Sequence, residues 1–240
     1  DILPRARLLD RLNQGRQRTL TLISAPAGYG KSTLASRWVA ACDCPSGWVS
    51  LDESDSDLRT FLSYVLAAVS SLFPQIELRT EDLLEGNPLP LAPVLAHQLL
   101  NDLQEITEPF MLVLDDFHRI RRGGPVHDFL KKILEYPPQA MHLVLLTRHD
   151  PPFALSGLRG RGQVNEIRAA DLRFTPAEAT AFLREKLMIP VDDASAAILD
   201  EKTEGWVTAR VRRPVLILGR LDGVETRQRV AGDALRRPQQ

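Results

Sequence analysis

The sequence predicts a three-layer α/β fold, in which a parallel β-sheet lies between two layers of helices. Short apolar runs alternate with longer stretches whose apolar residues recur at helical spacing, the pattern of a sheet whose strands are joined by helices. The runs at 110–114 and 141–146 are apolar at almost every position, as expected of central strands buried on both faces. After Phe174 the pattern is helical only, which predicts a small helical subdomain following the sheet.

Composition excludes several classes of protein. The 240 residues are 44% hydrophobic and 25% charged with a net charge of −1, so a packed core is expected and no basic surface for nucleic acid covers the molecule. No apolar run has the length of a membrane span, and the charged start lacks the apolar core of a signal peptide, so we expect a cytoplasmic location. Cys42 and Cys44 are the only cysteines and cannot complete a zinc site alone.

The strands follow one another in the order expected of this fold. Each predicted strand is a short run of apolar or β-branched residues bounded by polar residues, glycine or proline. The predicted strands are 19–24, 47–51, 110–114, 141–146 and 164–167.

The helices are predicted from apolar periodicity. In the stretch 58–72, for example, Leu58, Leu62, Val65 and Val69 fall on one face of a helix. Thr175 and Glu178 form a capping-box pattern, with proline at the first helical position. The predicted helices are 33–41, 58–72, 94–106, 126–134, 175–187, 194–203 and 206–221, and the proline-containing stretch 77–93 is predicted to be a loop.

A glycine-rich segment, Ala25 to Thr33, joins the first strand to the first predicted helix. It matches the phosphate-binding pattern G-x-x-x-x-G-K-[ST] with alanine at the first position. Backbone N–H groups of such a loop, together with the helix N-terminus, cradle phosphates. Lys31 would reach the β- and γ-phosphates, Ser32 would hold magnesium, and Thr33 would line the α-phosphate. The predicted nucleotide-binding residues of this loop are Ala27, Gly28, Tyr29, Gly30, Lys31, Ser32 and Thr33.

Two acids end the third strand, in the sequence Phe-Met-Leu-Val-Leu-Asp-Asp. An apolar strand that ends in a carboxylate, downstream of a phosphate loop, is the Walker B pattern of ATP-binding proteins. Asp115 is predicted to bind magnesium through a water, because Mg²⁺ keeps several waters and uses few carboxylates. Asp116 is predicted to orient or deprotonate the attacking water.

Arg148 directly follows the fourth strand. If that strand is inserted between the first and the third, as in many ATPases of this kind, its end points at the γ-phosphate. A planar guanidinium suits phosphate oxygens, so Arg148 is predicted to sense the γ-phosphate. The predicted strand order is then 5-1-4-3-2, with a nucleotide-binding domain over 1–172 and a helical subdomain with a basic tail over 173–240.

Taken together, these segments resemble the nucleotide-binding core of the STAND ATPases, and within them the large ATP-dependent LuxR-family regulators of the maltose-regulon-activator type. The resemblance extends from Ile2 to about Leu221. It rests on LPRARLLDRL, LISAPAGYGKSTLASRW, GWVSLDESDSDLRTFLSYVLAAV, LVLDDFHRI, LVLLTRHDPP, LSGLRGRGQVNEIRAADLRFTPAEATAFL and TEGWVTA in this order. That family commonly has alanine at the position of Ala25.

The resemblance implies site residues and partners beyond those that the motifs predict. Pro4 and Arg5 would lie near the adenine, His118 would belong to the site, and Arg159 and Arg161 would lie in a polar loop near the nucleotide. It implies ATP or ADP with Mg²⁺ as cofactors and nucleotide-dependent self-association. DNA and an inducer would be bound only by domains outside this chain.

Two functions from different classes remain open. The first is a molecular switch in a signal-responsive transcriptional regulator, in which slow ATP hydrolysis resets the active state. The second is a phosphotransferase or a turnover-driven ATPase, although no acceptor pocket is marked by the sequence. The arginines after Gly205 favour a solvated helix face and tail, with DNA binding as the alternative.

Overall fold

A five-stranded parallel sheet forms the middle layer of the protein. The computed structural model describes residues 5–153, 155–175, 177–178 and 180–181. The sheet order is β2-β3-β4-β1-β5, so the predicted order is confirmed, read from the opposite edge. The strands are β1 (Leu20–Ser24), β2 (Ser46–Ser50), β3 (Phe110–Asp115), β4 (Met141–Thr147) and β5 (Val164–Arg168).

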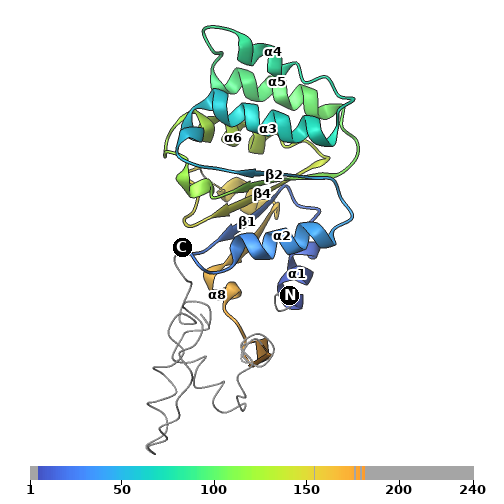
Figure 1. Cartoon of the computed structure of the whole chain (residues 1–240), viewed down its shortest axis with the longest axis vertical. Coiled ribbons are helices and arrows are strands. Elements are labelled where there is room, and N and C mark those ends of the chain that lie inside the picture. Colours follow the sequence, from blue (N-terminus) through green and yellow to red (C-terminus); the bar gives the residue numbers. More distant parts are fainter. Residues whose placement is uncertain (1–4, 154, 176, 179, 182–240) are drawn as a thin grey trace, which may run out of the picture.

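Helices cover both faces of this sheet (Figure 1). One face carries α3 (Leu58–Leu72), α5 (Ala92–Gln104) and α6 (Pro125–Glu135), with the short α4 (Thr80–Glu85) on the outside. The other face carries α1 (Ala6–Gln14), α2 (Lys31–Ala41) and α8 (Ala169–Leu172). The remaining short helices are η1 (Ser54–Ser56), η2 (Phe117–Arg119) and α7 (Ser156–Gly160). The three predicted layers are therefore present.

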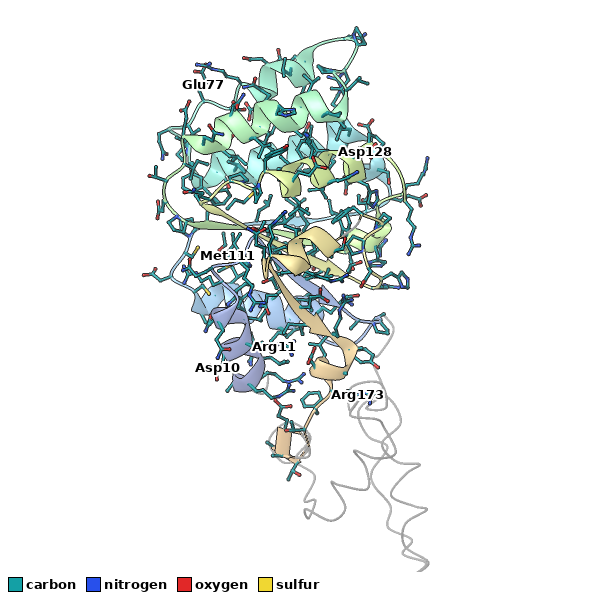
Figure 2. All side chains as sticks on the ribbon, turned by 180° about the vertical axis from the view of Figure 1, so that it is seen from behind. Asp10, Arg11, Glu77, Met111, Asp128 and Arg173 are labelled. Atoms are coloured by element: carbon teal, nitrogen blue, oxygen red, sulfur yellow. The ribbon has the colours of Figure 1, made fainter. Side chains whose placement is uncertain are left out.

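The sheet separates two hydrophobic cores. In β3, Leu112 and Leu114 pack into the core under α3, α5 and α6, whereas Met111 and Val113 pack against α1 and α2. Figure 2 shows Met111 in the sheet, with Asp128 among the helices on one side and Asp10 among those on the other. Because successive side chains of a strand point to opposite faces, a strand between two cores is apolar at most positions. This explains the largely apolar runs of β3 and β4.

Helix α1 was not predicted, although it completes one core. Its buried residues Leu8 and Leu12 pack with Trp38 of α2. The Trp38 indole donates to Asn13 Oδ1 at 2.9 Å. The apolar positions of α1 are spaced correctly for a helix, but the arginines between them obscured the periodicity.

The predicted loop over 77–93 is wrong in part, because α4 occupies 80–85. Its start is fixed by a buried carboxylate of another helix: Asp102 of α5 accepts hydrogen bonds from the Thr80 backbone N–H at 2.9 Å and from the Thr80 hydroxyl at 2.6 Å. Leu84 of this helix is buried. A six-residue helix has little intrinsic stability, so it forms through this tertiary interaction rather than through its own sequence.

Of the three helices predicted after residue 174, only the start of the first lies within the described residues. The capping box at the start of the helix predicted at 175–187 is present: Glu178 N–H donates to Thr175 Oγ1, and Thr175 N–H donates to Glu178 Oε2 at 2.8 Å. The rest of that helix beyond 181 lies outside the described residues, as do the helices predicted at 194–203 and 206–221 and the arginine-rich tail. Among the described helices, none is both long enough and apolar enough to span a membrane.

His142 is a buried titratable group in β4. Its Nδ1 lies 2.5 Å from the carbonyl oxygen of Arg18, and its Nε2 lies 2.9 Å from the Thr21 hydroxyl. The carbonyl can only accept, so Nδ1 carries the proton and Nε2 accepts from Thr21 in the neutral ring. Burial lowers the pKa of His142 to about 4, against an ordinary value of 6.5.

We expect the pKa of His142 to make stability depend on pH. Between pH 6.5 and 4 the unfolded chain binds a proton at this histidine that the folded chain does not, so stability falls as pH falls through this range, by about 3 kcal/mol in total. Urea unfolding from pH 7 to pH 4 measures this slope. His142→Gln should flatten it, leaving the dependence that comes from other groups with lowered pKa values: His118 and His127 through burial, and Asp150 and Glu166 through their arginine partners. An unchanged slope in the variant would contradict the assignment.

Gly15, which ends α1, is the second site of an expected stability effect. A β-carbon at this position would lie 2.2 Å from Asn165 Nδ2 of β5, a side chain that is buried and donates to the Arg11 carbonyl. We expect Gly15→Ala to lower the free energy of unfolding by about 1–3 kcal/mol, because the packed asparagine must move. Denaturant unfolding measures the loss. Gly157→Ala in α7, where a β-carbon meets nothing within 4 Å, is the control and should cost no stability.

Candidate functional site

The carboxyl ends of three neighbouring strands place the motif residues at one edge of the sheet. β4 lies between β1 and β3, so the residues that follow these three strands must lie close together. In open parallel sheets, ligands bind at this edge. Lys31, Asp115, Asp116 and Arg148 are brought together in this way. Beside the larger effect of burial, the charge of Arg148 lowers the pKa of Lys31, and the charges of the two aspartates raise it.

The phosphate loop between β1 and α2 has the backbone that its glycines predict. Gly28 and Gly30 have φ of 84° and 75°, in the left-handed region that residues with a β-carbon rarely adopt. Gly30 also directly precedes α2, so the free N–H groups of that helix begin at Lys31. Ala25, at the position usually held by glycine, is buried in the core on the α2 face, and its N–H donates to the Thr147 carbonyl at 3.2 Å. A methyl group fits there.

Lys31 is buried, with 8% of its surface exposed, and its ammonium bridges its own loop. Nζ donates to the carbonyl of Ala25 at 2.8 Å and to that of Pro26 at 3.1 Å. Its pKa is lowered, first by burial and then by the positive charge of Arg148. None of the described acids forms an ion pair with it. A desolvated cation that is held only by carbonyl groups is well suited to receive an anionic ligand.

A hydroxyl and a carboxylate meet beside the loop. Ser32 Oγ donates to Asp115 Oδ1 at 3.1 Å, and the same oxygen accepts the backbone N–H of Asp116 at 2.8 Å. Both are hard oxygen ligands, which fit Mg²⁺. The described residues contain no group of three or more His, Cys, Asp or Glu side chains that could hold a metal by themselves. The donor set therefore fits a magnesium ion that takes its other ligands from phosphate and water.

Asp116 turns the chain sharply after β3. Its φ is 55°, the one positive value among the described residues other than glycine. Aspartate tolerates this left-handed conformation better than most residues do. Its carboxylate, 43% exposed, lies 3.7 Å from His118 Nδ1 and 3.7 Å from Arg119 Nε. It therefore remains accessible to a solvent molecule at the edge of the sheet.

His118, at the centre of η2, is mostly buried. Its Nδ1 has no hydrogen-bond partner among the described residues. Burial and then the charge of Arg148 lower its pKa, so the ring is neutral at pH 7. His118 therefore lies with Lys31, Asp116 and Arg148 in one electrostatic group.

The three arginines predicted to lie at or near the nucleotide, Arg148, Arg159 and Arg161, differ in their contacts. Arg148 is exposed at the end of β4 and forms no ion pair with a described residue. Arg159 of α7 instead pairs with Glu166 at 2.5 Å and with Asp150 at 3.5 Å. Arg161 Nε donates to the side chain of Gln163 at 2.9 Å. These two arginines are therefore engaged on the β5 side of the sheet.

Of the two residues predicted near the adenine, Arg5 lies against the residues that follow α8. Pro4 lies outside the described residues. Arg5 donates to the carbonyls of Leu172 and Arg173 at 3.0 and 2.8 Å and lies 4.5 Å from the centre of the Phe174 ring. Within the described part of the chain its Nε has no hydrogen bond, and it lies 3.4 Å from Glu178 Oε1. These contacts were not predicted, because their partners are far away in sequence.

No protein-family model matches the chain, but curated proteins do. It is 36% identical over 205 residues to the HTH-type transcriptional regulator MalT of Serratia proteamaculans, and 35% identical over 205 residues to MalT of Yersinia enterocolitica. Each match takes in 85% of this chain and 22% of the relative, so the chain spans about a fifth of the length of the relatives it matches.

Two solved structures share the fold. A signal transduction ATPase with numerous domains (STAND) and a tetratricopeptide-repeat sensor, from Pyrococcus horikoshii, aligns with a TM-score of 0.61 at 19% identity, over 85% of this chain and 28% of that one. A Walker-type ATPase of Pyrococcus abyssi aligns with a TM-score of 0.52 at 15% identity, over 84% of this chain and 63% of that one. The chain is thus MalT-like in sequence and has a STAND-type P-loop fold.

We expect Ser32→Ala to weaken nucleotide binding only when magnesium is present. Loss of the hydroxyl removes one predicted metal ligand, so the affinity for ATP should fall about tenfold in Mg²⁺ and remain unchanged in EDTA. Calorimetric titration of ATP in the two buffers measures the difference. Ser36→Ala, on the exposed side of α2, is the matched control. An equal loss in both buffers would assign Ser32 to the phosphates instead of the metal.

Proposed function

We propose that this chain, a MalT-like nucleotide-binding module with a STAND-type fold, is the ATP- and magnesium-dependent switch of a signal-responsive transcriptional regulator. In this proposal it binds an adenine nucleotide at the edge formed by β1, β4 and β3. Slow hydrolysis of ATP would return the regulator to its resting state. Recognition of DNA and of an inducer would belong to parts of the regulator outside this chain, and self-association would depend on the bound nucleotide.

The observation that carries the proposal is the grouping of Lys31, Ser32, Asp115, Asp116 and Arg148 at one sheet edge. Lys31 would neutralise the β- and γ-phosphates. Ser32 and Asp115 would hold Mg²⁺, which supplies charge neutralisation between the phosphates. The loop from Ala27 to Thr33 would cradle the phosphates through its N–H groups, and Pro4 and Arg5 would lie on the adenine side.

Hydrolysis is expected to be slow in this site. Asp116 would orient the attacking water, yet its side chain is shorter than that of glutamate. Its carboxylate also makes no close hydrogen bond to His118 or Arg119, each of which lies 3.7 Å away. Slow hydrolysis suits a switch, because the lifetime of the ATP-bound form then sets the length of the signal.

A switch further requires that ATP and ADP be bound differently. The γ-phosphate is the only group that distinguishes them, and Arg148 is the predicted group that would read it. Lys31 Nζ donates to the carbonyls of Ala25 and Pro26, so contact with a phosphate would exchange these hydrogen bonds for hydrogen bonds to the ligand. A difference of a few kcal/mol between the two nucleotides is enough to change which conformation predominates.

The competing function is a phosphotransferase or an ATPase with rapid turnover. Such an enzyme needs a pocket for an acceptor beside the γ-phosphate. A cavity of about 290 Å³ is lined by residues of α6, α7 and the segment before α7, such as Glu135, Phe153 and Leu158. None of its lining residues belongs to the phosphate loop or to the acids after β3. This cavity is therefore not an acceptor pocket of that kind, and the turnover measurement below separates the two functions.

The proposal is tested by titrating ATP, ADP and GTP with Mg²⁺ into the protein and into Lys31→Ala. Adenine nucleotides should bind in preference to GTP, and the variant should lose about 100-fold in affinity, because hydrogen bonds from one charged group to two phosphates are lost. Lys132→Ala on α6, where Lys132 pairs with Glu135, is the control and should bind normally.

Turnover measured in the same samples separates the two functions. Barely detectable hydrolysis by a protein that binds ATP tightly supports the switch, whereas rapid multiple turnover supports the enzyme. Failure of the folded protein to bind any of the three nucleotides would refute both.

A further inference from the structure

An ion pair joins the ends of two strands that are not neighbours. Arg168, the last residue of β5, binds both carboxylate oxygens of Asp150, the third residue after β4. The hydrogen bond between Arg168 Nη2 and Asp150 Oδ2 is 3.2 Å long, and Nη1 binds Oδ1. Such two-point pairing between a planar guanidinium and a carboxylate fixes the relative orientation of the two groups. The hydrogen bonds to Arg168 are the main cause that lowers the pKa of Asp150.

The register of the sheet shows what this pair crosses. Ser24, the last residue of β1, pairs with Thr147 of β4 on one side and with Arg168 of β5 on the other. The Asp150–Arg168 pair therefore spans the carboxyl end of β1, at the point where the chain enters the phosphate loop. Ala25, the next residue, also donates its N–H to the Thr147 carbonyl.

Two further side chains close the pair into a ring. Glu166 accepts from Arg168 Nε at 2.9 Å and from Arg159 Nε at 2.5 Å, and Arg159 Nη2 lies 3.5 Å from Asp150. Each arginine thus contacts both acids, and each acid contacts both arginines. Removal of one long-range pair would leave the other members exposed to water, so a loss of folding is not expected from a change in this ring alone.

The turn that carries Arg148 is fixed at both of its ends. Upstream, the Thr147 hydroxyl donates to the His149 carbonyl at 2.8 Å. Downstream, Pro151 and Phe153 are buried, and the Phe153 ring contacts Phe117 at 6.2 Å between centroids. Within this turn, Asp150 lies two residues after Arg148, and its side chain is bound by Arg168.

We propose that Asp150 and Arg168 are positioning residues for Arg148, and that the pair sets the preference of the site for ATP over ADP. The inference rests on the proposed function, in which Arg148 reads the γ-phosphate. The pair fixes the position of the turn after β4 with respect to the end of β1. It thereby also fixes the position of the Arg148 backbone with respect to the phosphate loop. Neither Asp150 nor Arg168 touches the nucleotide in this arrangement.

The test compares Arg168→Gln, Arg168→Lys and Asp150→Asn with the unchanged chain and with Arg148→Ala. Affinities for ADP and for a non-hydrolysable ATP analogue are measured with Mg²⁺, and amide hydrogen exchange of residues 147–151 is measured without nucleotide. Arg121→Gln is the matched control, because Arg121 also pairs with an acid on the surface, Glu53, but after β3 and β2, away from the β5 edge of the sheet.

In Arg168→Gln the backbone amide hydrogens of residues 147–151 should exchange faster. The preference of this variant for the ATP analogue over ADP should fall about tenfold, while its affinity for ADP stays within twofold of that of the unchanged chain. Arg168→Lys keeps the charge and should recover part of the preference. Combining Arg168→Gln with Asp150→Asn should add little, since the two residues act as one pair. The Arg121 variant should match the unchanged chain in both measurements.

Unchanged exchange in Arg168→Gln would overturn the inference, as would an equal loss of affinity for ADP and the ATP analogue, which is what a general structural defect produces. Faster exchange with an intact preference, while Arg148→Ala abolishes it, would also overturn the inference but leave the proposed function standing. If the unchanged chain itself shows no preference for the ATP analogue, the proposed function fails, and the positioning role fails with it.

Discussion

The insertion of β4 between β1 and β3 is the constraint on which the site depends. Its ladder with β1 aligns Ser24 with Thr147, and its ladder with β3 aligns Leu114 with Leu145, so the ends of the three strands lie at one level. Thr147 then accepts the first N–H of the phosphate loop. The hydrogen bonds of the sheet thus bring the loop lysine, the acids after β3 and the arginine after β4 within one electrostatic group. Both hydrophobic cores hold this arrangement in place, because every residue of β3 and β4 is buried.

The charges of this group are balanced without close pairing in the described structure. Lys31 bonds carbonyl groups, Asp115 bonds a hydroxyl and an N–H, and Asp116 lies 3.7 Å from its nearest partners. Close ion pairs between these residues would have to be broken before an anion could bind, at the full cost of desolvated charges. Neutral His118 adds no further positive charge at pH 7. The fold therefore keeps its charged groups near one another but available.

Sequence reasoning succeeded where a local pattern carries the information. The apolar runs of β3 and β4 and the contiguous loop from Ala25 to Thr33 identified the sheet, its order and the strand ends at which the candidate residues lie. It failed where the cause is a distant residue. Helix α4 depends on Asp102, and neither Asp150 nor Arg168 differs in sequence from an ordinary surface charge. The partners of Arg5 were missed for the same reason, since the carbonyls of Leu172 and Arg173 are 167 and 168 positions away in the sequence.

Contacts of the amino-terminal arginines limit where such a module can be cut and joined to another protein. Arg5, Arg7 and Arg11 bind carbonyl and carboxylate groups within 166–178, so the first and last parts of the described chain are joined to each other (Figure 2 labels Arg11 and Arg173). A recombination crossover at the boundary predicted after residue 172 would replace Glu178 and the Phe174 ring while retaining the arginines. Arg5, which is largely desolvated, would then lose Glu178, its one acidic partner among the described residues. The group of residues that must be inherited together therefore extends beyond β5 and α8, at least as far as Glu178.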